Sequence, residues 1–473
     1  MSALATTAFT LSRDSDLPLF IQVSDLVRQS IVNGQLQQDH RLPPSRSLAI
    51  ELGVSRTTVV VAYDQLAAEG YIEGRRGSGF FVCPIGQVEL NRDNSNAVSI
   101  ASPATISAQS RKQVHPGFPD LRLFPYRQWA RCMSRVARLS PEALVVADDS
   151  FGDIELRQSI ARYLRDWRGL QTSAEQILIT AGSIDALEIC VRTLAGSGQY
   201  VGLENPGYQP LRNIVQGLGM EPVWLGMDDH GIEVPRLTKS QPSPSMTILT
   251  PSHQFPLGGA MSPLRRMEYL QWAEQTNSWI IEDDYDSEFR YAGSPIQALA
   301  GFDNTGRTIY VGTFSKIFSV GLRLGFLVTP PELISRFSKT LERFGVKAAT
   351  ASQRALASFM DSGEFYRHIR RVRRVYGERR KFLLNLLQEK LGDVVTFEDH
   401  AAGMQLLARL PAGYDDKAIV EAATREGVIT TALSDHYAQG KVQNGLLLGF
   451  CGFTETEIEA NISIIENIIR SNY

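Results

Sequence analysis

Hydrophobic positions change their spacing along the chain, and these changes divide it into three parts. Between residues 18 and 83, apolar residues first recur at helical spacing and then alternate in short runs, which predicts helices followed by a β-hairpin. Between residues 84 and 115, large apolar residues are scarce and Ser, Asn, Ala and Gln prevail, as is typical of a linker. We therefore expect a first domain at 14–83, a linker at 84–115 and a second domain at 116–473.

The second domain combines two alternating patterns. Short apolar runs at 177–180, 247–250, 279–281 and 308–311 have the composition of buried parallel strands, and amphipathic helical patterns separate them. This alternation predicts an α/β domain around a mostly parallel sheet. A basic helical stretch at 367–381 then leads into an α+β segment, so we expect a smaller C-terminal subdomain from about residue 365.

Composition adds limits to this picture. A chain of 473 residues with 43% hydrophobic and 21% charged residues is typical of a soluble protein of two or three domains. The formal net charge of -3 means that any contact with nucleic acid depends on a local basic surface. The four cysteines form no Cys-x-x-Cys pair, and residues 1–12 lack the features of a signal peptide. With no apolar run long enough to span a membrane, we expect a cytoplasmic protein without disulfides.

Two short helices joined by a tight turn are predicted near the start of the chain. Ser45 follows two prolines and is expected to cap the first helix, and Gly53 permits the turn that stops it. Ser55 is expected to cap the second helix, whose first turn exposes Arg56, Thr57 and Thr58. The inward-facing residues of this helix would be Val59, Ala62, Tyr63 and Leu66. Such a pair forms a helix-turn-helix, in which an arginine at the start of the second helix can contact guanine.

A hairpin follows, with a tip rich in glycine and arginine. Arg75 and Arg76 at this tip suit contacts with phosphates or the minor groove. Six arginines between residues 18 and 83 are balanced by six acidic residues, so we expect modest DNA affinity for each monomer and a benefit from dimeric binding. The alternative is a small helical packing domain with an exposed hairpin.

In the second domain, a lysine and an arginine follow the apolar run at 308–311. Lys316 ends the segment TFSK at the end of this predicted strand, where an amine can form a Schiff base with an aldehyde cofactor. Arg323 lies seven residues further on, between small residues, where a guanidinium can clamp a phosphate. The alternatives are a solvated surface lysine and a surface ion pair.

Acidic residues follow the run at 279–281 in the segment EDDYD. A buried aspartate there can keep a pyridine nitrogen protonated, and the tyrosine hydroxyl can bind a phenolic oxygen. A Mg²⁺ site or a solvated acidic loop are the alternatives.

Three loops complete the candidate chemistry. Gly182, Ser183 and Ile184 stand where a strand passes into a helix, a layout that binds anions through free N–H groups. Tyr208 lies in a Pro-Gly turn and can stack on a flat cofactor, although a tyrosine in such a turn more often packs on its own loop. The loop at 250–259 carries a histidine and a glutamine.

The first domain resembles the GntR-type winged helix-turn-helix over about 65 residues. It matches PLFIQ at 18–22, LPPSR at 42–46, GVSRTTV at 53–59 and GSG at 77–79. The resemblance implies binding to a double-stranded DNA operator. The implied DNA contacts are Arg46, Ser55, Arg56, Thr57, Thr58, Arg75, Arg76 and Gly77.

The second domain resembles fold-type I aminotransferases, and specifically the MocR branch of GntR regulators. The resemblance rests on PGFPD at 116–120, SHQFP at 252–256, EDDYDSEFRY at 282–291 and GTFSK at 312–316. It implies a homodimer and pyridoxal 5′-phosphate as the cofactor, held by Lys316 as an internal aldimine, with Asp283 on the pyridine nitrogen and Tyr285 on the ring oxygen. It also implies a phosphate site and a stacking ring. The residues implied there are Ser315, Arg323, Gly182, Ser183 and Ile184 around the phosphate, and Tyr208 over the ring.

The chain departs from the aminotransferase pattern at three positions. Leu447 stands where these enzymes carry the arginine that binds the α-carboxylate of the substrate, and Pro210 and Phe255 replace two further family residues. Arg212 is close to Pro210 and is a candidate substitute. We therefore expect a transcription regulator that senses pyridoxal phosphate, or an adduct of it with an amine that lacks an α-carboxylate. An active aminotransferase with a DNA-binding appendage and a fold without cofactor are the alternatives.

Overall fold

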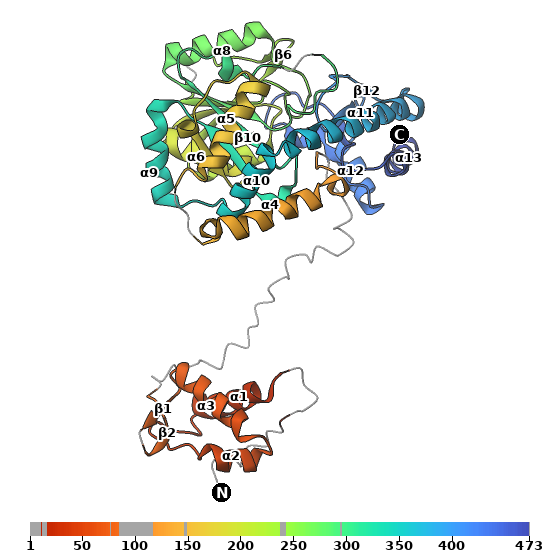
Figure 1. Cartoon of the computed structure of the whole chain (residues 1–473). Coiled ribbons are helices and arrows are strands. Elements are labelled where there is room, and N and C mark those ends of the chain that lie inside the picture. Colours follow the sequence, from red (N-terminus) through yellow and green to blue (C-terminus); the bar gives the residue numbers. More distant parts are fainter. Residues whose placement is uncertain are drawn as a thin grey trace. The chain divides into compact units, whose positions relative to one another are not determined.

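The computed structural model describes residues 11, 17–75, 77–84, 117–145, 149–236, 243–293 and 296–472. The chain divides into two compact units, Met1–Thr105 and Ile106–Tyr473 (Figure 1). The linker expected at 84–115 lies outside the described residues except for Pro84.

The first unit is a winged helix-turn-helix, as expected. Its elements are α1 (Leu19–Val32), α2 (Ser45–Leu52), α3 (Arg56–Ala68), β1 (Ile72–Arg75) and β2 (Gly79–Val82). Gly53 ends α2 with φ 66°, and the Ser55 hydroxyl caps α3 by accepting the Thr58 N–H at 3.0 Å. The predicted cap at Ser45 is wrong, because Ser45 is already helical and Pro44, which has no side-chain donor or acceptor, precedes it.

The core of this unit forms where the three helices meet the hairpin. The four residues predicted to face inward from α3 are all buried, and Leu48 of α2 and Val82 of β2 pack against the same core. The Tyr63 hydroxyl donates to the Pro43 carbonyl at 2.9 Å, so the Pro-Pro step is tied to the recognition helix. Packing and this bond together fix the angle at which α3 presents its first turn.

A seven-stranded sheet organises the second unit. Its strands are β3 (Ile177–Thr180), β4 (Tyr200–Glu204), β5 (Glu221–Leu225), β8 (Met246–Leu249), β9 (Trp279–Asp284), β10 (Thr308–Thr313) and β11 (Gly325–Val328). The order is β3-β11-β10-β9-β8-β4-β5, with β11 antiparallel to both neighbours and the other pairs parallel. The mostly parallel sheet and all four predicted strands are confirmed; β3 has the predicted boundaries, and those of β8, β9 and β10 differ by one to three residues. A two-stranded ribbon, β6 (Met227–Asp228) and β7 (Gly231–Ile232), lies outside this sheet.

Helices cover both faces of the sheet. They are α4 (Tyr126–Leu139), α5 (Ile154–Arg168), α6 (Ser183–Leu194), α7 (Gln209–Gly217), α8 (Pro263–Thr276), α9 (Ile334–Phe344) and α10 (Thr350–Asp361). Strand side chains alternate between two cores: Ile177 and Ile179 pack with α4, α5 and α10, while Leu178 packs with α6, α7 and α9. Burial on both faces explains why these strands read as continuous apolar runs.

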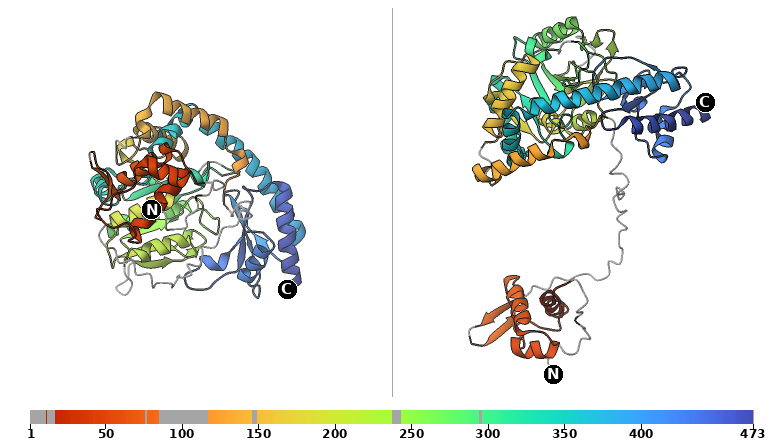
Figure 2. Two further views of the ribbon diagram at one scale, coloured as in Figure 1. Left: turned by 90° about the horizontal axis from the view of Figure 1, so that it is seen from below. Right: turned by 45° about the vertical axis from the view of Figure 1, so that its right-hand side comes forward.

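The C-terminal part of the second unit begins with the long helix α11 (Glu364–Leu391). Its other elements are β12 (Thr396–Phe397), β13 (Gln405–Arg409), α12 (Asp416–Arg425), β14 (Thr431–Ala432), β15 (Gly445–Gly449) and α13 (Glu455–Asn472). The four strands form a sheet in the order β12-β13-β15-β14, and α11 and α13 pack together beside it (Figure 2). Of the described helices, none combines the length and apolar character that a membrane crossing requires.

Candidate functional site

The sheet topology brings three predicted motifs to one edge. Thr180 of β3 pairs with Gly325 of β11, and Gly325 pairs in turn with Thr313 of β10. On the other side of β10, Gly312 pairs with Asp284 of β9. The loops that follow β3, β9 and β10 therefore leave the sheet side by side, as binding loops do at the carboxyl ends of parallel strands.

A cavity of about 390 Å³ opens at this edge. Its wall includes Ser183, Tyr208, Asp283, Tyr285 and Lys316, all predicted from the sequence. The other lining residues are Gly117, Phe118, Gln209, Pro210, Thr250, Phe255, Asp286, Met404, Gln405, Thr431, His436 and Leu447. Such a volume suits a small organic ligand.

Lys316 presents a buried amine to this cavity. Its Nζ donates to the Gly117 carbonyl at 2.9 Å and lies 5.5 Å from the centre of the Phe118 ring. Burial lowers the pKa of this amine, although the carboxylates of Asp286 and Asp283 oppose the shift. A lower pKa increases the fraction of neutral amine, which is the form that attacks an aldehyde carbon.

Asp283 is a buried carboxyl group with an unused acceptor. Its Oδ1 is buried and accepts no hydrogen bond from any described residue. Burial, reinforced by Asp284 and Glu204, raises the pKa of this carboxyl to about 7. A carboxylate in such a position requires a donor, and a protonated ring nitrogen in the cavity would supply it. The residues present thus fit a pyridinium cofactor.

We predict that Asp283→Asn stabilises the cofactor-free protein at high pH. The folded state holds the Asp283 proton up to a pKa of about 7, whereas an ordinary aspartate carboxyl loses it at a pKa of 3.8, so stability falls as pH rises between these values. Asparagine carries no charge to desolvate. Thermal unfolding of cofactor-free protein should show the variant melting higher at pH 8, on the order of 5 °C, with a smaller gain at pH 5. An equal difference at both pH values would contradict this assignment.

Tyr285 and His253 are linked beside the cavity. The Tyr285 hydroxyl lies 3.0 Å from His253 Nδ1, and the same nitrogen lies 3.0 Å from Asp286 Oδ2. Burial raises the pKa of the Tyr285 phenol, so it stays protonated and remains a donor. His253 had no assigned role in the sequence prediction, because only the fold brings its loop to β9.

The predicted phosphate residues lie at the same edge but do not all line the cavity. Gly182, with φ 100°, precedes α6, and Ser183 at the helix start faces the cavity. A Cβ at Gly325 would lie 2.8 Å from the Gly182 carbonyl carbon, so these two backbones are in close contact. Arg323, two residues before β11, is exposed with φ 50°. Gly182, Ile184, Ser315 and Arg323 are not among the lining residues.

A second buried acid behind the cavity escaped the sequence prediction. Glu204 accepts the Thr250 N–H at 2.6 Å, the Thr250 hydroxyl at 2.7 Å and the Gln254 amide at 3.1 Å. Burial raises the pKa of this carboxyl to about 7 despite these bonds. The network joins the ends of β4 and β8, so it holds the loop of Phe255 in place.

The three departures from the aminotransferase pattern all lie in the cavity wall. Leu447 on β15 is buried, and it lines the cavity together with Pro210 and Phe255. Arg212 borders an adjacent small recess and does not line this cavity, so its proposed substitution is not supported. Among the described lining residues, Lys316 supplies the sole lysine or arginine side chain.

The first unit presents most of its predicted DNA contacts to solvent. Arg46, Ser55, Arg56, Thr57 and Gly77 are exposed. Thr58 is half-buried, and its hydroxyl lies 2.8 Å from that of Ser55, so the cap engages both residues.

Acidic residues surround the one described arginine of the wing tip. Arg75 pairs with Asp39 at 2.5 Å and with Glu73 at 2.8 Å, and its guanidinium covers the Phe81 ring. Arg76 lies outside the described residues. The acids partly neutralise Arg75 before any phosphate approaches.

Comparisons with known proteins agree with this two-part structure. The family of bacterial regulatory proteins named gntR matches residues 21–82, and aminotransferase class I and II matches residues 127–464. The probable rhizopine catabolism regulatory protein MocR of Rhizobium meliloti is 38% identical over 97% of this chain and 95% of its own. The pyridoxine biosynthesis transcriptional regulator PdxR of Corynebacterium glutamicum is 32% identical over 98% and 99%. An archaeal alanine:glyoxylate aminotransferase superposes with a TM-score of 0.72 and 26% identity, covering 77% of this chain and 93% of that one.

Proposed function

The chain belongs to the MocR subfamily of GntR-type transcription regulators, and on this premise we propose that it senses pyridoxal phosphate, or an amine joined to it, through Lys316. The winged helix makes it a DNA-binding regulator, and the aminotransferase-like domain supplies the sensing pocket. We propose that the effector is attached covalently to Lys316. We also propose that the protein acts as a homodimer, in which effector binding in the second domain alters DNA binding by the first.

One observation carries the proposal: a buried amine and a buried carboxyl with an unused acceptor share one cavity. Lys316 Nζ and Asp283 Oδ1 are the two groups. Pyridoxal phosphate supplies an aldehyde that an amine captures and a ring nitrogen that withdraws electrons when protonated. Asp283 would hold the proton on that nitrogen, and Tyr285 would donate to the ring oxygen. The α6 N-terminus at Gly182 and Ser183, with Arg323, would bind the phosphate.

We propose that this pocket serves sensing and not turnover. The described wall contains no arginine, its one lysine is Lys316, which the cofactor would occupy, and Asp283 and Asp286 lie beside it, so a free α-carboxylate would be desolvated without a cationic partner. The relatives named as regulators, among them one of pyridoxine biosynthesis, support a regulatory use of the fold. Pyridoxal phosphate itself, or its product with an amine lacking an α-carboxylate, is therefore the proposed effector.

The test measures DNA binding with and without the effector. The full chain would be titrated against its own upstream DNA by fluorescence anisotropy, first without cofactor, then with pyridoxal phosphate, and then with amines added. A change in Kd of about fivefold or more would support sensing. An unchanged Kd in protein that is visibly loaded with cofactor would reject it. Steady transfer of amino groups would instead identify a working enzyme.

We predict that Leu447→Arg makes the pocket accept amino acids. A guanidinium on β15 would give the α-carboxylate a bidentate partner, and charged hydrogen bonds are worth about 1.5–3 kcal/mol, or roughly tenfold or more in affinity. Titration of the loaded protein with phenylalanine and with phenethylamine, followed by absorbance, should show the gain for phenylalanine alone. Leu447→Met is the matched control, since it changes side-chain shape without adding charge. A gain for both ligands would show that space, and not charge, limits binding.

A further inference from the structure

Helix α4 carries a row of exposed arginines. Arg127, Arg131, Arg135 and Arg138 are all exposed, and the helix contains no acidic residue. Spacings of three and four residues place them along one side of the helix, over about 16 Å at 1.5 Å per residue.

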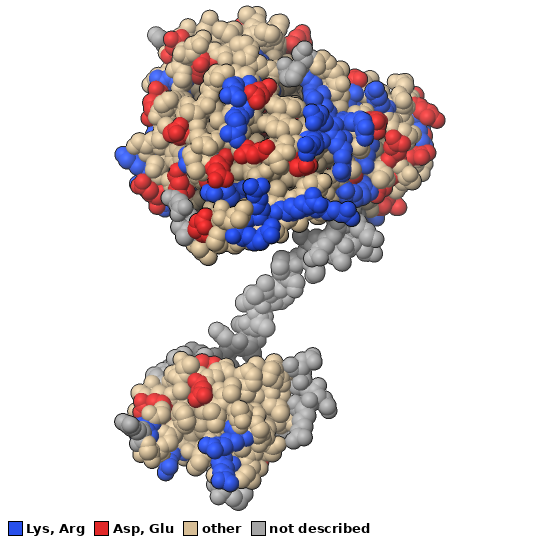
Figure 3. Space-filling model, in the orientation of Figure 1, with Lys and Arg blue, Asp and Glu red and all other residues tan. Residues whose placement is uncertain are grey.

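Helix α11 extends this row. Arg370, Arg371 and Arg374 are exposed on it, and the Arg371 guanidinium donates to the Leu123 carbonyl at 2.8 Å, just before α4 begins. In Figure 3, lysine and arginine side chains form a nearly continuous band over α4 and α11. We call these seven arginines of α4 and α11 the arginine face.

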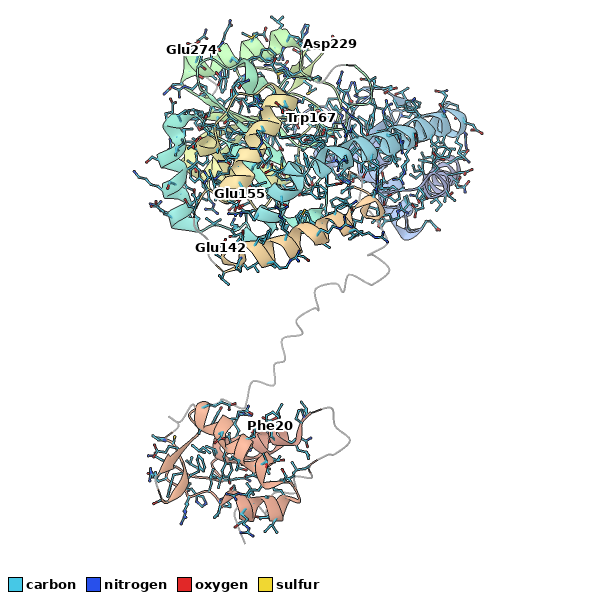
Figure 4. The ribbon with its side chains drawn as sticks, in the orientation of Figure 1. Phe20, Glu142, Glu155, Trp167, Asp229 and Glu274 are labelled. Atoms are coloured by element: carbon cyan, nitrogen blue, oxygen red, sulfur yellow. The ribbon has the colours of Figure 1, made fainter. Side chains whose placement is uncertain are left out.

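Packing holds α11 in this position. Trp167 of α5, labelled in Figure 4, stacks on Tyr366 with ring centres 6.0 Å apart, and the Arg373 guanidinium lies 5.8 Å from the Trp167 ring. The arginine face therefore stands on rigid helices, which lowers the entropy lost when it binds a partner.

The arginine face lacks the acidic partners that other surface arginines have. Arg162 pairs with Asp361, and Arg354 pairs with Asp153, both at 2.5 Å. In contrast, none of the arginines of the arginine face forms an ion pair with a described residue. Figure 4 shows Glu142 and Glu155 near the C-terminal end of α4, where Arg135 lines a recess together with Glu155 and Asp361 without forming an ion pair with either.

The positive charge of the arginine face contrasts with the negative net charge of the chain. The net charge is -3, yet seven guanidinium groups gather on one surface. Arginine forks suit phosphate oxygens because they donate two parallel hydrogen bonds.

Some of the arginines of the winged helix are already paired with acidic residues and are therefore less available to phosphates. Arg28 pairs with Glu69, and Arg75 pairs with Asp39 and Glu73. Since phosphate neutralisation dominates DNA affinity, the first unit alone would bind weakly.

We propose that the arginine face binds the phosphate backbone of the DNA duplex that the winged helix reads. The two units belong to one chain, so a duplex bound by the first is held at high local concentration for the second. The contact is independent of sequence, and it lengthens the protected DNA beyond the segment read by α3. This inference rests on DNA binding by the winged helix and not on cofactor binding.

The test removes three charges from α4 in the full chain. Arg127→Gln, Arg131→Gln and Arg135→Gln are combined, because these side chains form no hydrogen bond or ion pair with a described residue and glutamine keeps the helix propensity. The Kd for DNA is measured without cofactor at several salt concentrations. Two duplexes are compared: a short one that contains only the operator, and a long one in which additional DNA flanks the operator. On the long duplex we expect a loss on the order of tenfold and a salt slope lower by about 0.9 for each lost phosphate contact. On the short duplex the variant should match the wild type.

The matched control removes equal charge from another face. Arg336→Gln, Lys339→Gln and Arg343→Gln on α9, which Figure 1 places away from α11, should change neither Kd nor slope. Equal losses in both triple variants would overturn the proposal, because net charge alone would then explain them. An unchanged slope on the long duplex would also overturn it. So would a change in oligomeric state by sedimentation, which would make the arginine face an interface between copies. A cofactor-free measurement keeps these outcomes separate from a failure of sensing.

Discussion

Lys316→Ala is expected to abolish covalent capture of pyridoxal phosphate. The amine at 316 is buried, lines the cavity and has a lowered pKa, whereas no other described lining residue carries an amine. Purified wild-type protein incubated with the cofactor should be yellow, and the variant should be colourless after dialysis. Reduction with borohydride followed by peptide mass mapping should place a pyridoxyl group on Lys316 in the wild type.

A second variant at the same position distinguishes loss of covalent attachment from loss of the pocket. Lys316→Arg keeps the positive charge near Asp283 and Asp286 but cannot form the covalent link, so it should also be colourless. Both variants should keep the DNA affinity of the cofactor-free wild type and lose its response to pyridoxal phosphate. A pyridoxyl group found at another lysine, or a response that survives in Lys316→Ala, would refute the sensing site.

Arg56→Ala is expected to cause the largest loss of operator recognition. Arg56 is exposed in the first turn of α3, and the Ser55 cap holds that turn in its helical conformation. A bidentate contact with guanine discriminates by about 1–3 kcal/mol, so the variant should bind its operator roughly 5- to 150-fold more weakly. Competition between operator and unrelated DNA should show that the preference falls and not merely the affinity.

Arg28→Ala is the control within the same unit. Arg28 pairs with Glu69 and Asp25, and these acids already neutralise it. Its loss should lower general DNA affinity little and leave the preference for the operator unchanged. A preference that falls as much in Arg28→Ala as in Arg56→Ala would show that stability of the unit, and not base contact, is measured.

Much of the local structure was predictable because its causes lie within a few neighbouring residues. The turn at Gly53, the cap at Ser55 and the inward face of α3 depend on spacing and on backbone preference. The apolar runs likewise marked β3, β8, β9 and β10. The cap predicted at Ser45 failed because Pro44 occupies the N-cap position in an extended conformation and Ser45 is already the first helical residue.

The sequence by itself determined which chemical groups the chain carries and which short segments become helices or strands, since both follow from residue type and periodicity. Only the tertiary structure decided which groups meet. The contact of Lys316 with Gly117 spans 199 positions, Asp283 has an unused acceptor because of what packs around it, and Asp39 reaches Arg75 across 36 positions. Leu447 reaches the cavity wall only because the small sheet packs there. Hydrophobic periodicity reports which side of an element is buried but not against what, so contacts between distant segments and the pKa shifts they cause depend on the packed fold.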